Sequence, residues 1–241
     1  DCSADLIVFP ENFLSFGSKD IVESATEILQ YLPQFCEFAK THGVNLVLGT
    51  TPYYAQQENK LAKVTSRSLV IDRKGLLISH YDKLHLFDVD IGGEHGQYRE
   101  SDNYIAGDTI NVTTLGQLKL GLSICYDVRF PEIYQKMVLR GANTLILPAA
   151  FTKKTGEAHW EILLRARAIE TQCFLLASNQ GGVHENGQET WGHSMIISPW
   201  GEILAQCPDS GLGFCSAEID LVEVSRLRKS MPVASHKRSS I

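Results

Sequence analysis

The chain has 241 residues, of which 44% are hydrophobic and 21% charged, a balance typical of a soluble globular protein with a core of useful size. Its net charge of −6 offers no basic surface to nucleic acid or to an acidic membrane. No apolar run approaches the roughly 18 residues of a membrane span. The six cysteines are scattered and contain no CxxC pair, which favours a reducing, cytoplasmic setting.

Short apolar runs alternate with amphipathic stretches along the whole chain. In chain order, the expected elements are strand Leu6–Phe9, helix Ile21–Lys40, strands Asn45–Gly49, Ser66–Asp72, Leu76–Tyr81 and Lys119–Ile124, helix Pro131–Arg140, strand Thr144–Leu147, helix His159–Glu170, and strands Phe174–Ser178, Met195–Ser198 and Glu202–Cys207. Pro33 is expected to split the first helix, and Gly141 to cap the second.

Strands that alternate with helices predict an α/β fold. The turns Arg73-Lys74-Gly75 and Pro199-Trp200-Gly201 each join two strand-like runs, so antiparallel hairpins are expected as well. A mixed sheet or a two-sheet sandwich therefore fits better than a purely parallel sheet. Because no internal repeat or flexible linker interrupts the pattern, residues 1–241 are expected to form one domain.

The segment Gly121–Glu132 (GLSICYDVRFPE) carries the sharpest local feature. A strand ends at Cys125, and the chain must turn before the helix that Pro131 begins. A thiol on such a turn stands clear of the sheet, where backbone N–H groups can face an oxyanion. Taken alone, however, a cysteine at a strand end is better explained by burial in the core.

Two charged residues follow strands in the same way. Glu11 comes directly after LIVFP, at the edge where open α/β sheets bind ligands. Lys83, in HYDKLHLFD, has apolar neighbours, and a partly desolvated lysine can stabilise an oxyanion or a thiolate. Each of the two is an ordinary solvated side chain if considered by itself.

Glu, Lys and Cys in this order, each just past a strand, resemble the nitrilase (carbon–nitrogen hydrolase) superfamily. The matching segments are VFPENF, YDKLHLFDVDI, GLSICYDVRFPEIY, LPAAF, HWEILLRARAIETQC and GHSMIISPWGEIL, which cover nearly the whole chain in the family's order. The resemblance implies an αββα sandwich of two mixed sheets flanked by helices. It also implies a further strand and helix before DLIVFPE that are absent from this sequence, which opens on Asp1, and any targeting segment would lie upstream.

The resemblance further implies an amidase. Cys125 would attack an amide carbonyl and form a thioester, while Glu11 would take the thiol proton, pass it to the leaving amine and then activate water. Lys83 and the backbone N–H of Tyr126 would stabilise the oxyanion. No metal and no cofactor are expected, because the eight histidines show no HExxH motif or closely spaced ligand pair.

The family's second glutamate, which positions the site, corresponds to Glu100 in YRES, with Glu94 as the competing candidate. Charged side chains this close to one thiol would titrate as a coupled system.

Three residues are candidates for binding substrate. Arg129, four positions after Cys125, can hold a carboxylate bidentately, or can instead form a framework ion pair with Asp127 or Glu132. Phe151 and Thr152 are expected to line the pocket on the basis of the resemblance alone.

The segments LLRARAIETQC and WGHSMIISPWG look most like the deaminated glutathione amidases, which release ammonia from a primary amide of a carboxylate-bearing substrate. An ω-amidase acting on small α-keto amides and an uncharacterised short-chain amidase are the alternatives. From other classes, an inactive interaction protein on the same fold and a thiol oxidoreductase are both less well supported. An inactive protein is disfavoured because Glu11, Lys83 and Cys125 are all present. A thiol oxidoreductase is disfavoured because no resolving cysteine lies beside Cys125.

The expected helix at His159–Glu170 has apolar residues almost all around its axis. In the resembled family, this helix and the one after the nucleophile pack against a second subunit. A homodimer or a higher homo-oligomer, with a four-layer sandwich in each pair, is therefore expected.

Overall fold

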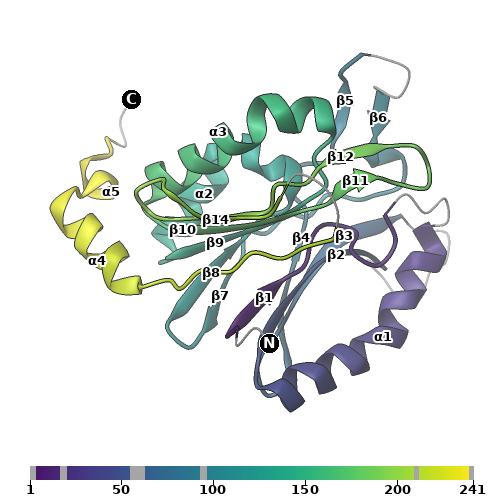
Figure 1. The fold of residues 1–241 in the computed structure, drawn as a ribbon, viewed down its shortest axis with the longest axis horizontal. Coiled ribbons are helices and arrows are strands. Elements are labelled where there is room, and N and C mark those ends of the chain that lie inside the picture. Colours follow the sequence, from purple (N-terminus) through teal and green to yellow (C-terminus); the bar gives the residue numbers. More distant parts are fainter. Residues whose placement is uncertain (1–3, 17–20, 55–62, 93–96, 209–211, 239–241) are drawn as a thin grey trace.

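The computed structural model describes residues 4–16, 21–54, 63–92, 97–208 and 212–238 (Figure 1). The strands are β1 Leu6–Val8, β2 Asn45–Tyr54, β3 Val64–Ile71, β4 Leu77–Asp82, β5 Asp88–Asp90, β6 Gln97–Arg99, β7 Val112–Leu115, β8 Leu118–Leu122, β9 Thr144–Ala149, β10 Phe174–Asn179, β11 Gly181–Val183, β12 Glu189–Trp191, β13 Met195–Ile197 and β14 Ile203–Gln206. The helices are α1 Ile21–His42, α2 Pro131–Leu139, α3 Lys153–Thr171, α4 Leu221–Ser230 and α5 Val233–His236, with 3₁₀ turns η1 Glu100–Asp102 and η2 Cys125–Arg129.

The strands form two main sheets. One has the order β1-β2-β3-β4, and the other has the order β14-β13-β10-β9-β8-β7. In the first sheet only β1 and β2 are parallel, whereas in the second β8, β9 and β10 are parallel and their outer neighbours antiparallel. The prediction of mixed sheets is therefore confirmed. Two short ribbons, β5–β6 and β11–β12, extend beyond the sheets.

Alternating side chains of β2 divide the core into two layers. Leu46 and Leu48 belong to the cluster that packs beneath α1, whereas Val47 belongs to the cluster between the two sheets. This period of two follows from the pleat of the strand. Figure 1 shows α1 outside the four-stranded sheet and α2 and α3 outside the six-stranded one, which confirms the expected αββα layering.

The prediction that Pro33 splits the first helix is wrong, because α1 runs unbroken from Ile21 to His42. Proline removes one backbone hydrogen bond, but Pro33 lies on the exposed side of the helix. Ile28 and Ala39, before and after it, are both fully buried in the same cluster against the sheet. Packing on both sides of the proline holds the two halves in one helix.

Two elements are longer than the sequence predicts. Strand β2 continues past Gly49 to Tyr54, because Thr50 and Thr51 are buried in it although both are polar. Helix α3 begins at Lys153 rather than at His159, since Thr152 caps it. Polar residues at both places hide the signal on which periodicity depends.

Candidate active site

Glu11 lies in a tightly held loop just beyond β1 and is only 4% exposed. The following residue, Asn12, has a φ of 53°, and its N–H donates to Oγ1 of Thr50 at 3.0 Å. The side-chain amide of Gln180 donates to the backbone carbonyl of Glu11 at 3.0 Å. These contacts fix the direction in which the Glu11 carboxylate points.

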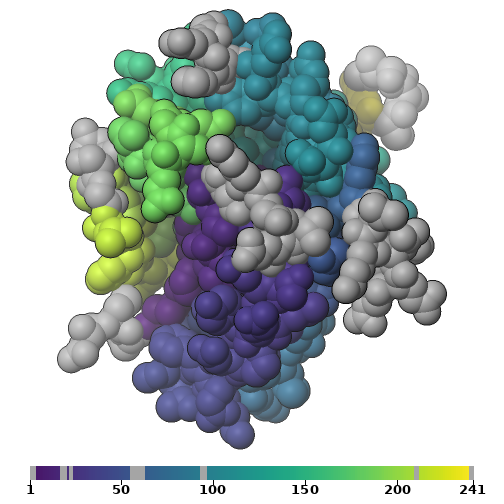
Figure 2. All heavy atoms as spheres, turned by 90° about the vertical axis from the view of Figure 1, so that its right-hand side faces the viewer, coloured from purple at the N-terminus to yellow at the C-terminus, as the bar shows by residue number. Residues whose placement is uncertain are grey.

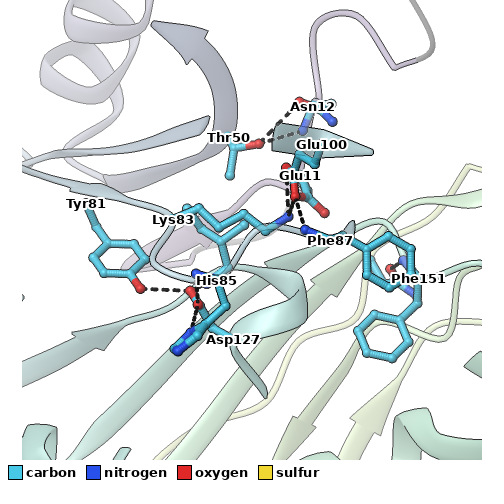
Figure 3. Close-up of polar contacts among 12 residues, drawn as sticks. Glu11, Asn12, Thr50, Tyr81, Lys83, His85, Phe87, Glu100, Asp127 and Phe151 are labelled. Atoms are coloured by element: carbon cyan, nitrogen blue, oxygen red, sulfur yellow. Dashed lines mark hydrogen bonds and ion pairs between the residues drawn. The ribbon is translucent and has the colours of Figure 1, made fainter. Parts of the chain in front are cut away.

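Lys83 follows β4 directly and is 2% exposed. Its own N–H donates to the carbonyl of Ser66 at 3.0 Å, so the backbone remains attached to β3. The ammonium Nζ lies 2.9 Å from Oε1 of Glu11 and 2.9 Å from Oε2 of Glu100. Figure 3 shows the two carboxylates converging on this one lysine.

Glu100 begins the turn η1 after β6. Its Oε2 also accepts a hydrogen bond from the backbone N–H of Phe87 at 2.6 Å, which ties η1 to the start of the β5–β6 ribbon. The structure thus places Glu100 beside Lys83, whereas the competing candidate Glu94 lies outside the described residues. Figure 2 looks onto this end of the molecule, where both ribbons and the residues near the N-terminus meet.

Cys125 is the first residue of η2, just past β8, and is 8% exposed. Its φ of 44° is rare for a residue with a side chain and marks a sharp turn out of the strand. Tyr126 comes next, in the first turn of η2, where backbone N–H groups have no acceptor within the turn itself. The thiol therefore sits on the kind of turn that the sequence predicts for it.

Burial and the nearby charge of Glu11 both favour the neutral form of the Cys125 thiol. Burial raises the pKa of the Cys125 thiol well above its ordinary value, and the negative charge of Glu11 raises it further. The positive charge of Lys83 and the backbone of Ala150 oppose this rise. Glu11 is therefore the carboxylate whose charge acts most strongly on this thiol.

Lys83 keeps its charge despite complete burial. Desolvation lowers the pKa of Lys83, but the charges of Glu100 and then Glu11 outweigh it and raise that pKa well above its ordinary value. Burial raises the pKa of Glu100, and the positive charge of Lys83 lowers it. The ammonium thus depends on both carboxylates, as a buried charge requires.

Arg129 lies at the other end of η2 and is partly buried. Its guanidinium nitrogens are 3.4 Å from Nδ1 of His159, and its carbon lies over the rings of Tyr126 and Phe151, 5.8 and 5.4 Å from their centroids. The framework ion pair left open by the sequence is not formed among the residues that the structure describes. The guanidinium therefore retains N–H donors that can bind an anion.

Phe151 and Thr152 occupy the connection between β9 and α3. The N–H of Phe151 donates to Oδ1 of Asn179 at 2.9 Å, and its buried ring faces Arg129. The hydroxyl of Thr152 accepts from the N–H of Thr155 at 3.4 Å, which is the role of a helix cap. The sequence did not reveal this capping role for Thr152.

A second polar cluster is centred on Asp127, and the sequence pattern did not predict it. Asp127 is fully buried and accepts hydrogen bonds from Tyr81, His85 and the backbone of Ile124. Tyr81, Lys83 and His85 are spaced by two residues. That alternation is the one signal in the sequence from which this cluster could have been predicted.

An α/β sandwich that gathers a thiol, an ammonium and two carboxylates at the ends of strands from both sheets and from the β5–β6 ribbon defines a class of protein, a hydrolase with a thiol in its site. A family model described as carbon-nitrogen hydrolase matches residues 1–229, so the chain belongs to the carbon–nitrogen hydrolase family. Together with relatives named as amidases, this makes it an amide-hydrolysing enzyme.

Three relatives illustrate the similarity. A Yersinia enterocolitica protein named deaminated glutathione amidase is 42% identical over 236 residues, which are 97% of this chain and 82% of that protein. The Caenorhabditis elegans nitrilase and fragile histidine triad fusion protein is 40% identical over 98% of this chain, but the chain spans only about half of its length, 54%. The crystal structure of that fusion protein has a TM-score of 0.88, with 98% of this chain and 57% of that one covered.

The third relative is an amidase from Nesterenkonia sp. AN1, and the structure of a glutamate-to-glutamine mutant of it shows acrylamide added to the active-site cysteine. It is 25% identical to this chain, with a TM-score of 0.75, and the match covers 95% of this chain and 85% of that one.

Within the part of the chain that the structure describes, no three histidine, cysteine or acidic side chains are grouped so that they could hold a metal ion. The described helices include none with the length and apolar character needed to cross a membrane.

Proposed function

We propose that this enzyme releases ammonia from a primary amide whose acyl part carries carboxylates, as in deaminated glutathione, through a thioester on Cys125. The observation that carries the proposal is the buried cluster of Cys125, Glu11, Lys83 and Glu100. A neutral thiol beside a carboxylate, with a charged ammonium near both, is suited to acyl transfer.

Each group has a defined step in this reaction. Glu11 removes the proton from the thiol as the sulfur attacks the amide carbon, and the oxygen that becomes negative is stabilised by Lys83 and the N–H of Tyr126. Glu11 then gives its proton to the leaving nitrogen, so ammonia departs and a thioester remains. Water attacks the thioester with Glu11 again as base, which frees a carboxylic acid and the thiol.

Glu100 has no proton to transfer in this sequence. Its carboxylate holds Nζ of Lys83, and the backbone N–H of Phe87 holds the carboxylate. The lysine is therefore aimed by two fixed carboxylates, which is the preorganisation that electrostatic stabilisation of an oxyanion requires.

Arg129 supports the choice of a substrate with a carboxylate. We expect ammonia release from deaminated glutathione to exceed that from small α-keto amides by more than about tenfold in kcat/KM, or some 1.4 kcal/mol. The Arg129→Met substitution should raise KM about tenfold or more for amides that carry a carboxylate, because it removes a bidentate partner of that carboxylate. The KM of a neutral amide should change little. Steady-state ammonia assays on the parent protein and on the variant measure the substrate preference and the change in KM.

The remaining amidases are distinguished by the same assays. A preference for small α-keto amides would identify an ω-amidase instead, and equal rates on all amides would reject the deaminated-glutathione assignment. If Arg129→Met changed KM equally for charged and neutral amides, Arg129 would not be the carboxylate anchor.

We also propose that the enzyme is a homodimer that pairs through the outer faces of α2 and α3. Ile162 on α3 and Leu139 at the end of α2 are 70% and 75% exposed, so both helices present large apolar side chains that a second subunit could bury. Sedimentation equilibrium should give twice the mass of the chain. Ile162→Lys should reduce that mass to one chain, and a monomeric parent protein would contradict the proposal.

A further inference from the structure

We infer that Asp127 is a positioning residue that holds Lys83 and Cys125 in fixed relation to one another. The inference rests on the proposed roles of those two residues. Asp127 touches neither the thiol nor the ammonium, but it binds the backbone or the flanking side chains of both segments.

One carboxylate oxygen of Asp127 joins the two sheets. Its Oδ2 accepts from the phenol of Tyr81 at 2.7 Å and from the backbone N–H of Ile124 at 2.9 Å. Tyr81 lies in β4, two residues before Lys83, and Ile124 directly precedes Cys125. Oδ2 therefore connects the strand that carries the lysine to the turn that carries the thiol (Figure 3).

The other oxygen holds the chain on the far side of Lys83. Oδ1 accepts from the backbone N–H of His85 at 3.0 Å and lies 2.7 Å from Nδ1 of the same residue. The ring of His85 in turn stacks on Phe130, at the end of η2, with a centroid distance of 3.6 Å and an interplanar angle of 7°. Lys83 is thus braced two residues before it and two residues after it by one carboxylate.

Three of the four contacts at this site require Asp127 to accept a hydrogen bond. Tyr81 and the backbone N–H groups of His85 and Ile124 all present hydrogens to its carboxyl oxygens. Burial, and then the charge of Asp127, raise the pKa of Tyr81 well above its ordinary value, so the phenol stays a donor. An asparagine has the same shape but would point its NH₂ group at one pair of donors.

The brace matters because Cys125 has a backbone conformation that side chains disfavour. A φ of 44° persists only where the surroundings impose it, and the bond from Ile124 to Asp127 lies immediately before that residue. Displacement of a reacting group by about 1 Å can reduce a rate about a hundredfold. Loss of the brace should therefore reduce the rate of chemistry more than the affinity for substrate.

The test compares Asp127→Asn with Asn45→Ala. Asn45 is a matched control, because its buried amide also joins two segments. It donates to the carbonyl of Asp5 at 2.7 Å and accepts from the backbone N–H of Arg73 at 3.0 Å. It is the first residue of β2 and makes no contact with the cluster around Lys83 in these bonds. For Asp127→Asn we expect kcat for ammonia release to fall about 10- to 100-fold, with KM changed less than about threefold. The rate at which acrylamide adds to Cys125, followed by intact mass, should fall in parallel, whereas Asn45→Ala should keep parental kcat and labelling rate.

Single-bond variants keep the inference testable if Asp127→Asn does not fold. Tyr81→Phe removes one donor, and we expect kcat and acrylamide labelling to fall several-fold with KM unchanged. Parental kcat and labelling in folded Asp127→Asn or in Tyr81→Phe would overturn the inference. Activity that survives Cys125→Ala would instead reject the proposed function, so the two failures are distinguishable.

Discussion

Replacing Cys125 with alanine should reduce ammonia release by about 10⁴-fold or more, to the limit of detection. Alanine retains the β-carbon and so fills most of the same space, but it provides no atom that can form the thioester. Because the Cys125 side chain is small and lies at the edge of the core, the variant should fold, which a thermal melt can check. The measurement is ammonia released per enzyme under saturating amide.

The matched control for this variant is Cys36→Ala. Cys36 is a free, half-buried cysteine of α1, on the outer side of the four-stranded sheet, so its thiol is remote from the cluster. Cys36→Ala should keep parental activity and still add one acrylamide at Cys125. Substantial ammonia release by Cys125→Ala would contradict a covalent mechanism on this thiol.

Lys83→Met should have the second largest effect, because it damages both activity and folding. The substitution leaves the carboxylates of Glu11 and Glu100 buried next to each other without the charge that each now contacts. Breaking a buried ion pair in this way costs about 3–5 kcal/mol of unfolding free energy. Loss of the oxyanion partner should lower kcat about 100- to 1000-fold. Urea unfolding and ammonia assays measure the two losses.

The pH dependence of this stability loss identifies its cause. Burial raises the pKa of Glu100, and Lys83 lowers it, so removing the lysine raises the pKa of Glu100 further. A carboxyl group with a raised pKa in the folded state favours folding below its unfolded value of about 4.3, and that contribution disappears as the pH rises through the folded value. The deficit of Lys83→Met should therefore be small near pH 4 and grow toward pH 8.

Lys119→Met serves as the control for the loss of one positive charge. Lys119 is an exposed residue of β8, so its replacement should change stability by less than about 0.5 kcal/mol at any of these pH values. If the deficit of Lys83→Met were the same at pH 4 and pH 8, unpaired buried carboxylates would not be its source.

Much of the fold and of the cluster could be predicted because the signals are local. Apolar runs and hairpin turns mark the strands of both sheets apart from β7, which the sequence did not predict. Glu11, Lys83 and Cys125 each follow such a run directly. The pattern alone did not identify these residues as a reactive site, because each of them has an ordinary explanation in isolation. The resemblance to a known family provided that assignment.

The features that sequence reasoning missed depend on contacts between distant segments. In the sequence, Asp127 is indistinguishable from any acidic residue on a turn. Its contacts with Tyr81 and His85 exist only because β4 packs against η2 in the folded chain. From sequence alone Pro33 predicts a break in the helix, because proline removes a local hydrogen bond. The packing of α1 against the four-stranded sheet outweighs that loss, and this packing is tertiary. Periodicity contains no information about either contact.

The wide spacing of the cluster along the chain determines when it can form. Lys83 and Glu11 are 72 positions apart, and Gln180 reaches the carbonyl of Glu11 across 169 positions. Such contacts close large loops, so they form only after local structure is in place. We therefore expect the site to be among the last parts of the molecule to assemble during folding. A proteolytic fragment that contains only the four-stranded sheet would keep Glu11 and Lys83 but would lack Cys125, however well that sheet holds its shape.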